Sequence, residues 1–223
     1  MRRSLIAWGR RNFASYPWRR SNHSPWLSLA TEVLLQRTKA EQVVPVYRAF
    51  AERYPEPHFL AREKPAELLN VVGSLGLRWR IPLMIEMAGR LGSGGPPDTL
   101  EELTELPGVG PYAAAAYLSF HRGRRAVIID ANVVRWLGRF FGFRTDAETR
   151  RKGWLIHLAD ELTPTQTYRD YNYAVLDLAM KLCVTKPRCQ ECPVSDGCRY
   201  FAKRATAADP EPLPRARGTR RPK

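Results

Sequence analysis

Apolar residues recur at intervals of three and four along most of the chain, the spacing that places them on one face of an α-helix. One such stripe begins at Trp26 and continues through Leu29, Val33 and Leu34. Comparable stripes, separated by Pro, Gly or Asn, predict helices over residues 41–54, 66–76, 81–91, 99–106, 111–121, 131–141, 150–162 and 169–182. No stretch sustains the alternation typical of a β-strand. The pattern therefore predicts an all-α protein built from short helices.

The composition is that of a basic globular protein. Of the 223 residues, 44% are hydrophobic, which is enough for a buried core. The formal net charge is +14, and residues 1–202 carry nine of these charges, because seven Lys/Arg in residues 203–223 are opposed only by Asp209 and Glu211. A basic folded body favours a nucleic-acid partner, although membrane surfaces also attract cations.

No apolar segment has the length of a membrane-spanning helix, and the run Leu5-Ile6-Ala7-Trp8 is too short for the core of a signal peptide. We therefore expect a cytoplasmic, nucleoid-associated protein that does not bind membranes. After Arg204, Pro, Arg and small residues dominate, which predicts a disordered basic tail over residues 205–223.

Two glycines follow a predicted helix that begins with the capping pattern Asp98-Thr99 and ends at Leu106-Pro107. They enclose one apolar residue in Gly108-Val109-Gly110, and a small-residue helix follows. Glycines permit a tight left-handed turn and let the next helix aim its N–H groups at an anion. An ordinary helix-loop-helix turn is the alternative interpretation.

Two carboxylates stand at positions suited to chemistry. Asp130 ends the apolar run 126–129 and precedes the helix predicted over 131–141, so it is either a helix cap or a reactive group. Glu32 lies at the edge of an apolar stripe and shares a helix face with Gln36. A carboxyl group in such surroundings is suited to general acid catalysis, whereas the alternative is a surface glutamate.

All four cysteines lie within sixteen residues, as Cys183-x5-Cys189-x2-Cys192-x5-Cys198. In a reducing compartment this density predicts a metal or cluster site before disulfides. Four thiolates can hold a [4Fe-4S] cluster or a tetrahedral zinc ion. Structural zinc sites more often use two close pairs, and only one CxxC pair occurs here, so we favour the [4Fe-4S] cluster.

These motifs together resemble the endonuclease III superfamily of helix-hairpin-helix DNA glycosylases over residues 5–200. The resemblance rests on Leu-Pro-Gly-Val-Gly at 106–110, on an aspartate eighteen residues after Tyr112, and on the cysteine loop, whose first spacing is one residue shorter than usual in the superfamily. The helix 31–38 is similar to that of adenine glycosylases and of thymine-DNA glycosylases acting on G·T mismatches.

The resemblance implies a set of site residues. Asp130 and Glu32 become catalytic, and Gly108, Val109 and Gly110 hold a DNA phosphate. Because the target base must leave the duplex, the resemblance also implies residues that surround it or fill the gap. These are Gln36 and Arg37 around the base or its partner, and Leu77 as a wedge with Arg78 or Trp79 nearby. An apolar loop buried in the core is the alternative interpretation of Leu77.

Tyr112 occupies the position at which strand-cutting superfamily members carry a lysine nucleophile, two residues after the last glycine of the hairpin. No lysine occurs between Lys64 and Lys152. We therefore expect a monofunctional enzyme that releases a base and leaves an abasic site, with Tyr112 as a third active-site residue.

By resemblance, residues 25–130 form a six-helix barrel domain, and residues 1–24 and 131–204 form the cluster domain. The active site lies between the two domains, and the protein is a monomer that binds double-stranded DNA.

Gln36-Arg37-Thr38 favours thymine or uracil opposite guanine as the target. Adenine opposite 8-oxoguanine or guanine is the alternative, although adenine enzymes usually carry a further C-terminal domain. A non-catalytic DNA-binding module is a second alternative, against which both carboxylates argue.

Overall fold

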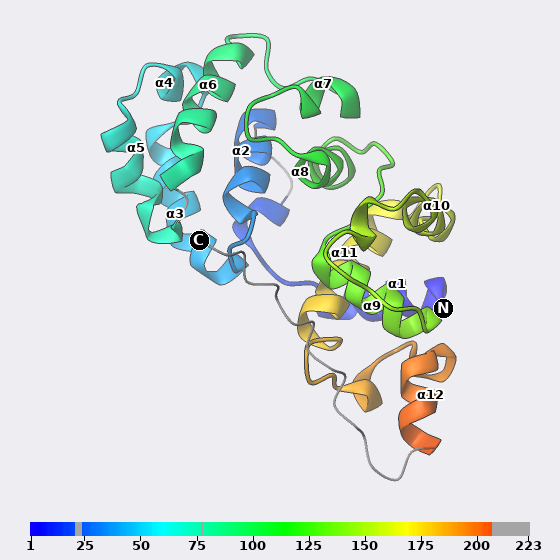
Figure 1. Ribbon diagram of the computed structural model, residues 1–223. Helices are drawn as coiled ribbons and strands as arrows, with labels where there is room; N and C mark the ends of the chain where they lie inside the picture. The colour runs from blue at the N-terminus through cyan, green and yellow to red at the C-terminus, as the bar shows by residue number, and fades with distance from the viewer. Residues whose placement is uncertain (21–23, 77, 207–223) are drawn as a thin grey trace, which may run out of the picture.

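The computed structural model describes residues 1–20, 24–76 and 78–206, and throughout these ranges the chain is helical without any β-strand, as the sequence predicts. The helices are α1 (Arg2–Asn12), α2 (Pro25–Leu35), α3 (Ala40–Arg53), α4 (Pro57–Ala61), α5 (Pro65–Val72), α6 (Ile81–Leu91), α7 (Leu100–Thr104), α8 (Pro111–Ala116), α9 (Ala131–Phe141), α10 (Gly153–Leu162), α11 (Tyr168–Lys181) and α12 (Arg199–Thr206). Figure 1 shows helices α2 to α8 on one side of the molecule, and α1 with α9 to α12 on the other.

Helices α2 to α8 enclose the larger apolar core. Its centre is formed by fully buried side chains such as Leu29, Phe50, Leu68 and Met84. Trp18, from the segment that precedes α2, also packs into this core, where its ring meets that of Tyr47 of α3 edge to face. The N-terminal segment therefore contributes to the packing of both halves of the molecule, whereas the predicted domain division assigns all of residues 1–24 to the cluster domain.

A second core joins the two ends of the chain. Helix α1 packs along α11, and both contact residues of α9. Gly9 allows the close approach of α1, because a β-carbon at that position would lie 2.5 Å from Cβ of Ala174. Helix α1 lacks a side-chain cap and a wide apolar face, so its stability comes from this packing against α11.

The chain between the two cores turns through a π-helical segment, η4 (Tyr117–His121), that continues α8. Asn172 of α11 donates hydrogen bonds to Ser119 Oγ and to the carbonyl oxygen of Ala126, both at 2.8 Å. These buried bonds tie α11 to η4 and to the segment that leads to Asp130. They fix the relative position of the elements that carry the candidate site residues.

The predicted helices mostly agree with the observed ones, with differences at the ends. Helix α7 is shorter than predicted, and α5 ends at Val72 before a 3-10 turn, η2 (Gly73–Leu75). Helices α1, α4 and α12 were not predicted, because each is short or rich in charged residues and shows a weak apolar stripe. Ala205 and Thr206 belong to α12 rather than to a tail, and residues 207–223 lie outside the described part.

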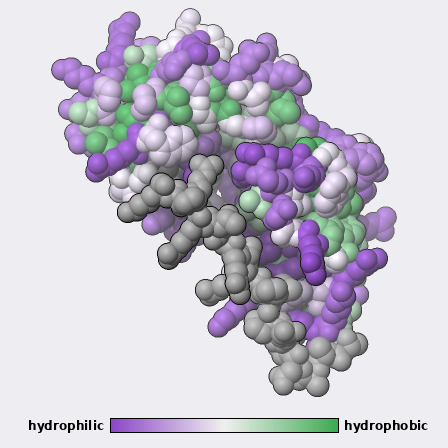
Figure 2. Space-filling view, viewed as in Figure 1, coloured by the Kyte–Doolittle hydropathy of each residue, from purple (hydrophilic) through white to green (hydrophobic). Residues whose placement is uncertain are grey.

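Hydrophilic side chains cover much of the face seen in Figure 2, in keeping with the basic composition. Within the described ranges, no helix is both long enough and apolar enough to cross a bilayer.

Candidate active site

Glu32 is buried in the middle of α2, with 3% of its surface exposed. The helical wheel places Glu32 at the edge of an apolar stripe, next to solvent. Instead, eight of the eleven residues of this helix are buried, and Glu32 is one of them. Its Oε1 lies 3.0 Å from Nε2 of His121, at the end of η4. A buried carboxyl group is costly unless it is hydrogen-bonded, and His121 supplies that bond.

Tyr112 lies in the first turn of α8, close to both carboxylates. Burial raises the pKa of its phenol well above the ordinary value, and the negative charges of Asp130 and Glu32 raise it further. Its ring packs against the small apolar cluster that contains Tyr173 and Phe120. Tyr112 thus stays a neutral phenol beside two acidic groups.

Asp130 caps helix α9, as one of the two sequence interpretations predicts. Its Oδ1 accepts a 2.7 Å hydrogen bond from the backbone N–H of Val133, and its Oδ2 accepts one of 2.7 Å from Nδ2 of Asn132. The side-chain oxygen of Asn132 accepts a bond from Arg135 at 3.0 Å. Capping and catalysis are compatible, since both bonds fix the orientation of the carboxylate.

The hairpin between α7 and α8 has the turn that its glycines predict. Gly108 has a φ of +80°, in the left-handed region that favours glycine, whereas Gly110 is extended and caps α8. Val109 is 5% exposed and belongs to the core, so only its backbone is available to a ligand. Thr99 caps α7 by accepting a hydrogen bond from the N–H of Glu102, as predicted.

Gln36 connects the end of α2 to this hairpin. Its Nε2 donates a 2.9 Å hydrogen bond to the carbonyl oxygen of Gly108. The next residue, Arg37, is exposed and has a φ of +57°, a strained value for a residue with a side chain. Arg80 stabilises this turn, because its buried guanidinium donates hydrogen bonds to the carbonyl oxygens of Val33 and Gln36.

The predicted wedge Leu77 lies outside the described residues. Arg78 and Trp79 follow it in the 3-10 turn η3 (Arg78–Arg80), and both side chains are exposed, Trp79 to 56%. The guanidinium of Arg80 lies 4.5 Å from the Trp79 ring centroid, which restrains the indole on the surface.

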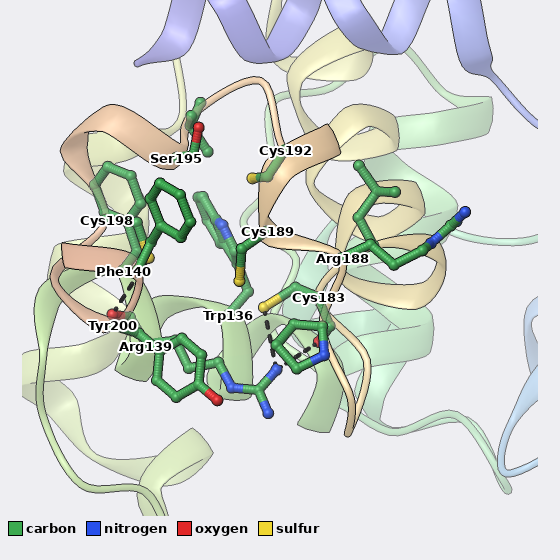
Figure 3. A pocket seen from close by; sticks show the side chains of 14 residues that line it. Trp136, Arg139, Phe140, Cys183, Arg188, Cys189, Cys192, Ser195, Cys198 and Tyr200 are labelled. Atoms are coloured by element: carbon green, nitrogen blue, oxygen red, sulfur yellow. Dashed lines mark hydrogen bonds between the residues drawn. The ribbon is translucent and has the colours of Figure 1, made fainter. Parts of the chain in front are cut away.

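The four cysteines are free thiols that line one pocket. Figure 3 shows their side chains around this pocket, with Trp136, Phe140 and Tyr200 completing its wall. Burial raises the pKa of Cys192 to about 11. A thiol in such surroundings becomes a thiolate when a metal replaces its proton.

The donor set fits a metal group held by thiolates. Four thiolates can surround a cubane iron-sulfur cluster, and four can also hold one zinc ion, in a pocket of this kind. Arg139 lies beside it, with a guanidinium nitrogen 3.5 Å from Cys183 Sγ.

Comparison with known proteins agrees with this arrangement. Residues 93–120 match the model of the helix-hairpin-helix motif. The chain is 36% identical over 212 residues to the thymine-DNA glycosylase of Aeropyrum pernix, covering 90% of this chain and 94% of that protein. The chain belongs to the helix-hairpin-helix DNA glycosylases, and it shares the fold of endonuclease III.

Two further relatives of this glycosylase bear on its chemistry. The solved structure of a thermostable thymine-DNA glycosylase has a TM-score of 0.83 and 29% identity, covering 91% of this chain and 95% of the other. The adenine DNA glycosylase of Mycobacterium tuberculosis is 32% identical over 205 residues, covering 88% of this chain and 66% of the relative. The sequence resemblance to both groups is thus confirmed.

Sequence reasoning placed Glu32, Tyr112 and Asp130 in one site, and the structure brings Tyr112 within electrostatic reach of each carboxylate. Sequence reasoning missed His121, Asn132 and Arg19, which contact or face these groups. The sequence could have indicated Asn132, because an amide two residues after a helix cap lies near that cap. It could not have indicated His121, because the pairing of His121 with Glu32 joins residues 89 positions apart.

Proposed function

We propose that this glycosylase is monofunctional and hydrolyses the bond between deoxyribose and a thymine or uracil paired with guanine. The observation that carries the proposal is the position of Tyr112, which stands where strand-cutting relatives need an amine and lies beside Glu32 and Asp130. A phenol has no amine nitrogen, so Tyr112 cannot form a Schiff base with the sugar. Water is then the nucleophile that replaces the base.

Asp130 and Glu32 have different catalytic roles in this proposal. As the base leaves, positive charge grows on the sugar, and the oriented carboxylate of Asp130 stabilises it. Glu32, buried and held by His121, delivers a proton to the departing base. The two carboxylates come from different helices, α2 and the start of α9, so one site can address base and sugar together.

DNA contacts follow from the hairpin and the loops beside it. The backbone of Gly108, Val109 and Gly110 holds a phosphate without reading sequence. Gln36 and Arg37 lie next to the hairpin, and the bond from Gln36 to Gly108 sets their spacing from the phosphate. Arg78 and Trp79 are exposed beside Leu77, where we expect the wedge that fills the space of the extruded base.

We infer that Cys183, Cys189, Cys192 and Cys198 hold a [4Fe-4S] cluster. When bound, the cluster orders the cysteine loop and thereby contributes to folding, rather than to base release. Arg139 donates hydrogen bonds to the carbonyl oxygens of Cys183, Val184 and Thr185 and so holds the start of this loop.

The domain division is also a proposal. The two apolar cores support a barrel domain over residues 25–130 and a cluster domain formed by residues 1–24 and 131–204. Tyr16 and Trp18 pack into the barrel core, and Val127 and Ile129 into the other core, so these four residues are exceptions. We further propose that the protein acts as a monomer on double-stranded DNA and is associated with the nucleoid in the cytoplasm.

Thymine or uracil is favoured because Gln36-Arg37-Thr38 resembles the G·T mismatch enzymes, and because the chain is 36% identical to a thymine-DNA glycosylase and 32% identical to an adenine DNA glycosylase. The test uses labelled duplexes with G·T, G·U, A·G and A·8-oxoguanine pairs, followed by alkali. We expect alkali-dependent cleavage at T or U. Release of adenine alone would establish the adenine alternative, and release from no duplex would favour a DNA-binding module.

A further inference from the structure

His121 and Glu32 form a buried pair in the candidate active site. Nε2 of His121 lies 3.0 Å from Oε1 of Glu32, and the two side chains are exposed to only 8% and 4%. His121 ends the π-helical turn η4, which packs against α2 and α11. A π turn contains an extra residue, so it changes the direction of the side chains that follow. This change brings the imidazole to Glu32.

The two oxygens of Glu32 have different surroundings. Oε1 is paired with His121, whereas Oε2 has no hydrogen-bond partner among the residues that the structure describes. The phenols of Tyr112 and Tyr173 lie close enough for the charge of Glu32 to contribute to their raised pKa values, after the larger effect of burial. Oε2 is thus the oxygen left to interact with a bound base.

We propose that His121 is a positioning residue that reserves the acidic proton of Glu32 for Oε2. This inference rests on the proposed role of Glu32 as general acid. Nε2 of His121 carries a hydrogen and donates it to Oε1, so a proton on the carboxyl group occupies Oε2. If Nε2 accepted instead, the proton of Glu32 would be held between Oε1 and the imidazole, away from the base.

The proton transfer then balances without another reactant. The glycosidic bond breaks, and its electron pair remains with the base. The Oε2–H bond breaks as a bond forms from that hydrogen to a nitrogen or oxygen of the base. The electron pair of the O–H bond stays on Glu32, and the N–H of His121 stabilises the new carboxylate.

Single-turnover base release by four variants tests this role. His121→Gln can place its amide N–H near the position of Nε2, whereas His121→Phe keeps a ring and loses the donor. We expect His121→Phe to slow release at least about tenfold and His121→Gln to stay within about threefold of wild type. In a Glu32→Gln background, His121→Phe should cause no further loss, because the two residues act as one unit.

Circular dichroism and thermal melting of each variant verify folding. Independent, multiplying effects of His121→Phe and Glu32→Gln would overturn the proposal, as would a His121→Gln variant as slow as His121→Phe with an intact fold.

Histidine nitrogen NMR on the full chain supplies a readout that does not depend on activity. We expect His121 to be protonated at Nε2, and its Nε2 signal to shift in Glu32→Gln while that of the exposed His58 stays unchanged. An unprotonated Nε2 would refute the inference. Failure of the proposed function would instead appear as no base release by the wild type from any duplex, whatever the NMR result.

Discussion

Asn132 donates a 2.7 Å hydrogen bond to Oδ2 of Asp130, and this bond joins the candidate catalytic carboxylate to a longer chain of contacts. Arg135 donates to Asn132 Oδ1 and also to the carbonyl oxygens of Ala179 and Cys183. The orientation of Asp130 is therefore linked, through two side chains, to the first residue of the cysteine loop. This link gives the loop a structural influence on the site.

Removing the charge of Asp130 while keeping its cap tests its role. Asp130→Ser retains an oxygen that caps α9, whereas Asp130→Asn places an amide against the amide of Asn132. We expect both variants to bind duplex DNA within about threefold of wild type and to lose more than about tenfold in base release. Binding by fluorescence anisotropy and single-turnover kinetics measure the two effects. A smaller loss of rate would mean that Asp130 is only a cap.

Tyr112 provides the test of monofunctional chemistry. Wild-type protein should yield abasic sites that break only with alkali or heat, and borohydride should trap no covalent complex. Tyr112→Lys should gain measurable trapping, since burial beside the base would leave part of the new amine deprotonated. Tyr112→Phe is the control, and it should trap nothing. Efficient trapping by the wild type would place lyase chemistry on another amine and contradict the proposal.

Anaerobically purified protein should be brown and contain about four irons per chain. Cys189→Ser should lose iron and soluble yield together, because cluster binding contributes to folding of the loop. Ser195→Ala is the matched control, since Ser195 lines the same pocket without being a proposed ligand. Metal analysis and the visible spectrum give the result. A colourless protein with one zinc ion would refute the cluster.

Stability should fall in alkali because buried tyrosines resist ionisation. Burial raises the pKa of Tyr54, Tyr117 and Tyr173 to about 12 in the folded protein. The same phenols ionise near pH 10 in the unfolded chain. Their contribution to the free energy of unfolding is therefore complete below pH 10 and is lost as pH rises toward 12, at up to about 1.4 kcal/mol per pH unit and residue. Urea unfolding at pH 8, 10 and 11 measures this.

Tyr117→Phe is the control for that experiment. The hydroxyl of Tyr117 has no hydrogen-bond partner among the described residues, so its removal should cost little at pH 8. The variant should lose less stability than wild type between pH 10 and pH 11. An equal loss would exclude Tyr117 from the alkaline transition.

The buried pair of Arg19 and Asp177 should be essential for folding. The guanidinium makes two bonds to the carboxylate, at 2.8 and 2.9 Å, and Asp177 also accepts the backbone N–H of Ala14. Asp177→Ala leaves a buried cation unpaired, which should cost about 3–5 kcal/mol of unfolding free energy. Asp170→Ala on the same helix breaks an exposed pair with Arg10 and should cost under about 1 kcal/mol. Equal losses would show that burial of the first pair does not matter.

The sequence by itself determined the features that depend on local chemistry. A left-handed turn at Gly108 follows from the freedom of glycine, the cap at Asp130 from its short carboxylate, and the main helices, though not their ends, from apolar spacing. The grouping of four cysteines within sixteen residues likewise indicated one shared site, and the four thiols line one pocket.

Only the tertiary structure decided the contacts between distant segments. Glu32 appears on a helical wheel at the edge of a stripe, yet it is buried because η4 and α8 pack over that face of α2. His121 reaches it through a π turn, which no apolar periodicity reveals. Arg19 pairs with Asp177 across 158 positions because α1 and α11 bring the chain ends together. Such pairings depend on how several helices share one core, and local spacing carries no information about that packing.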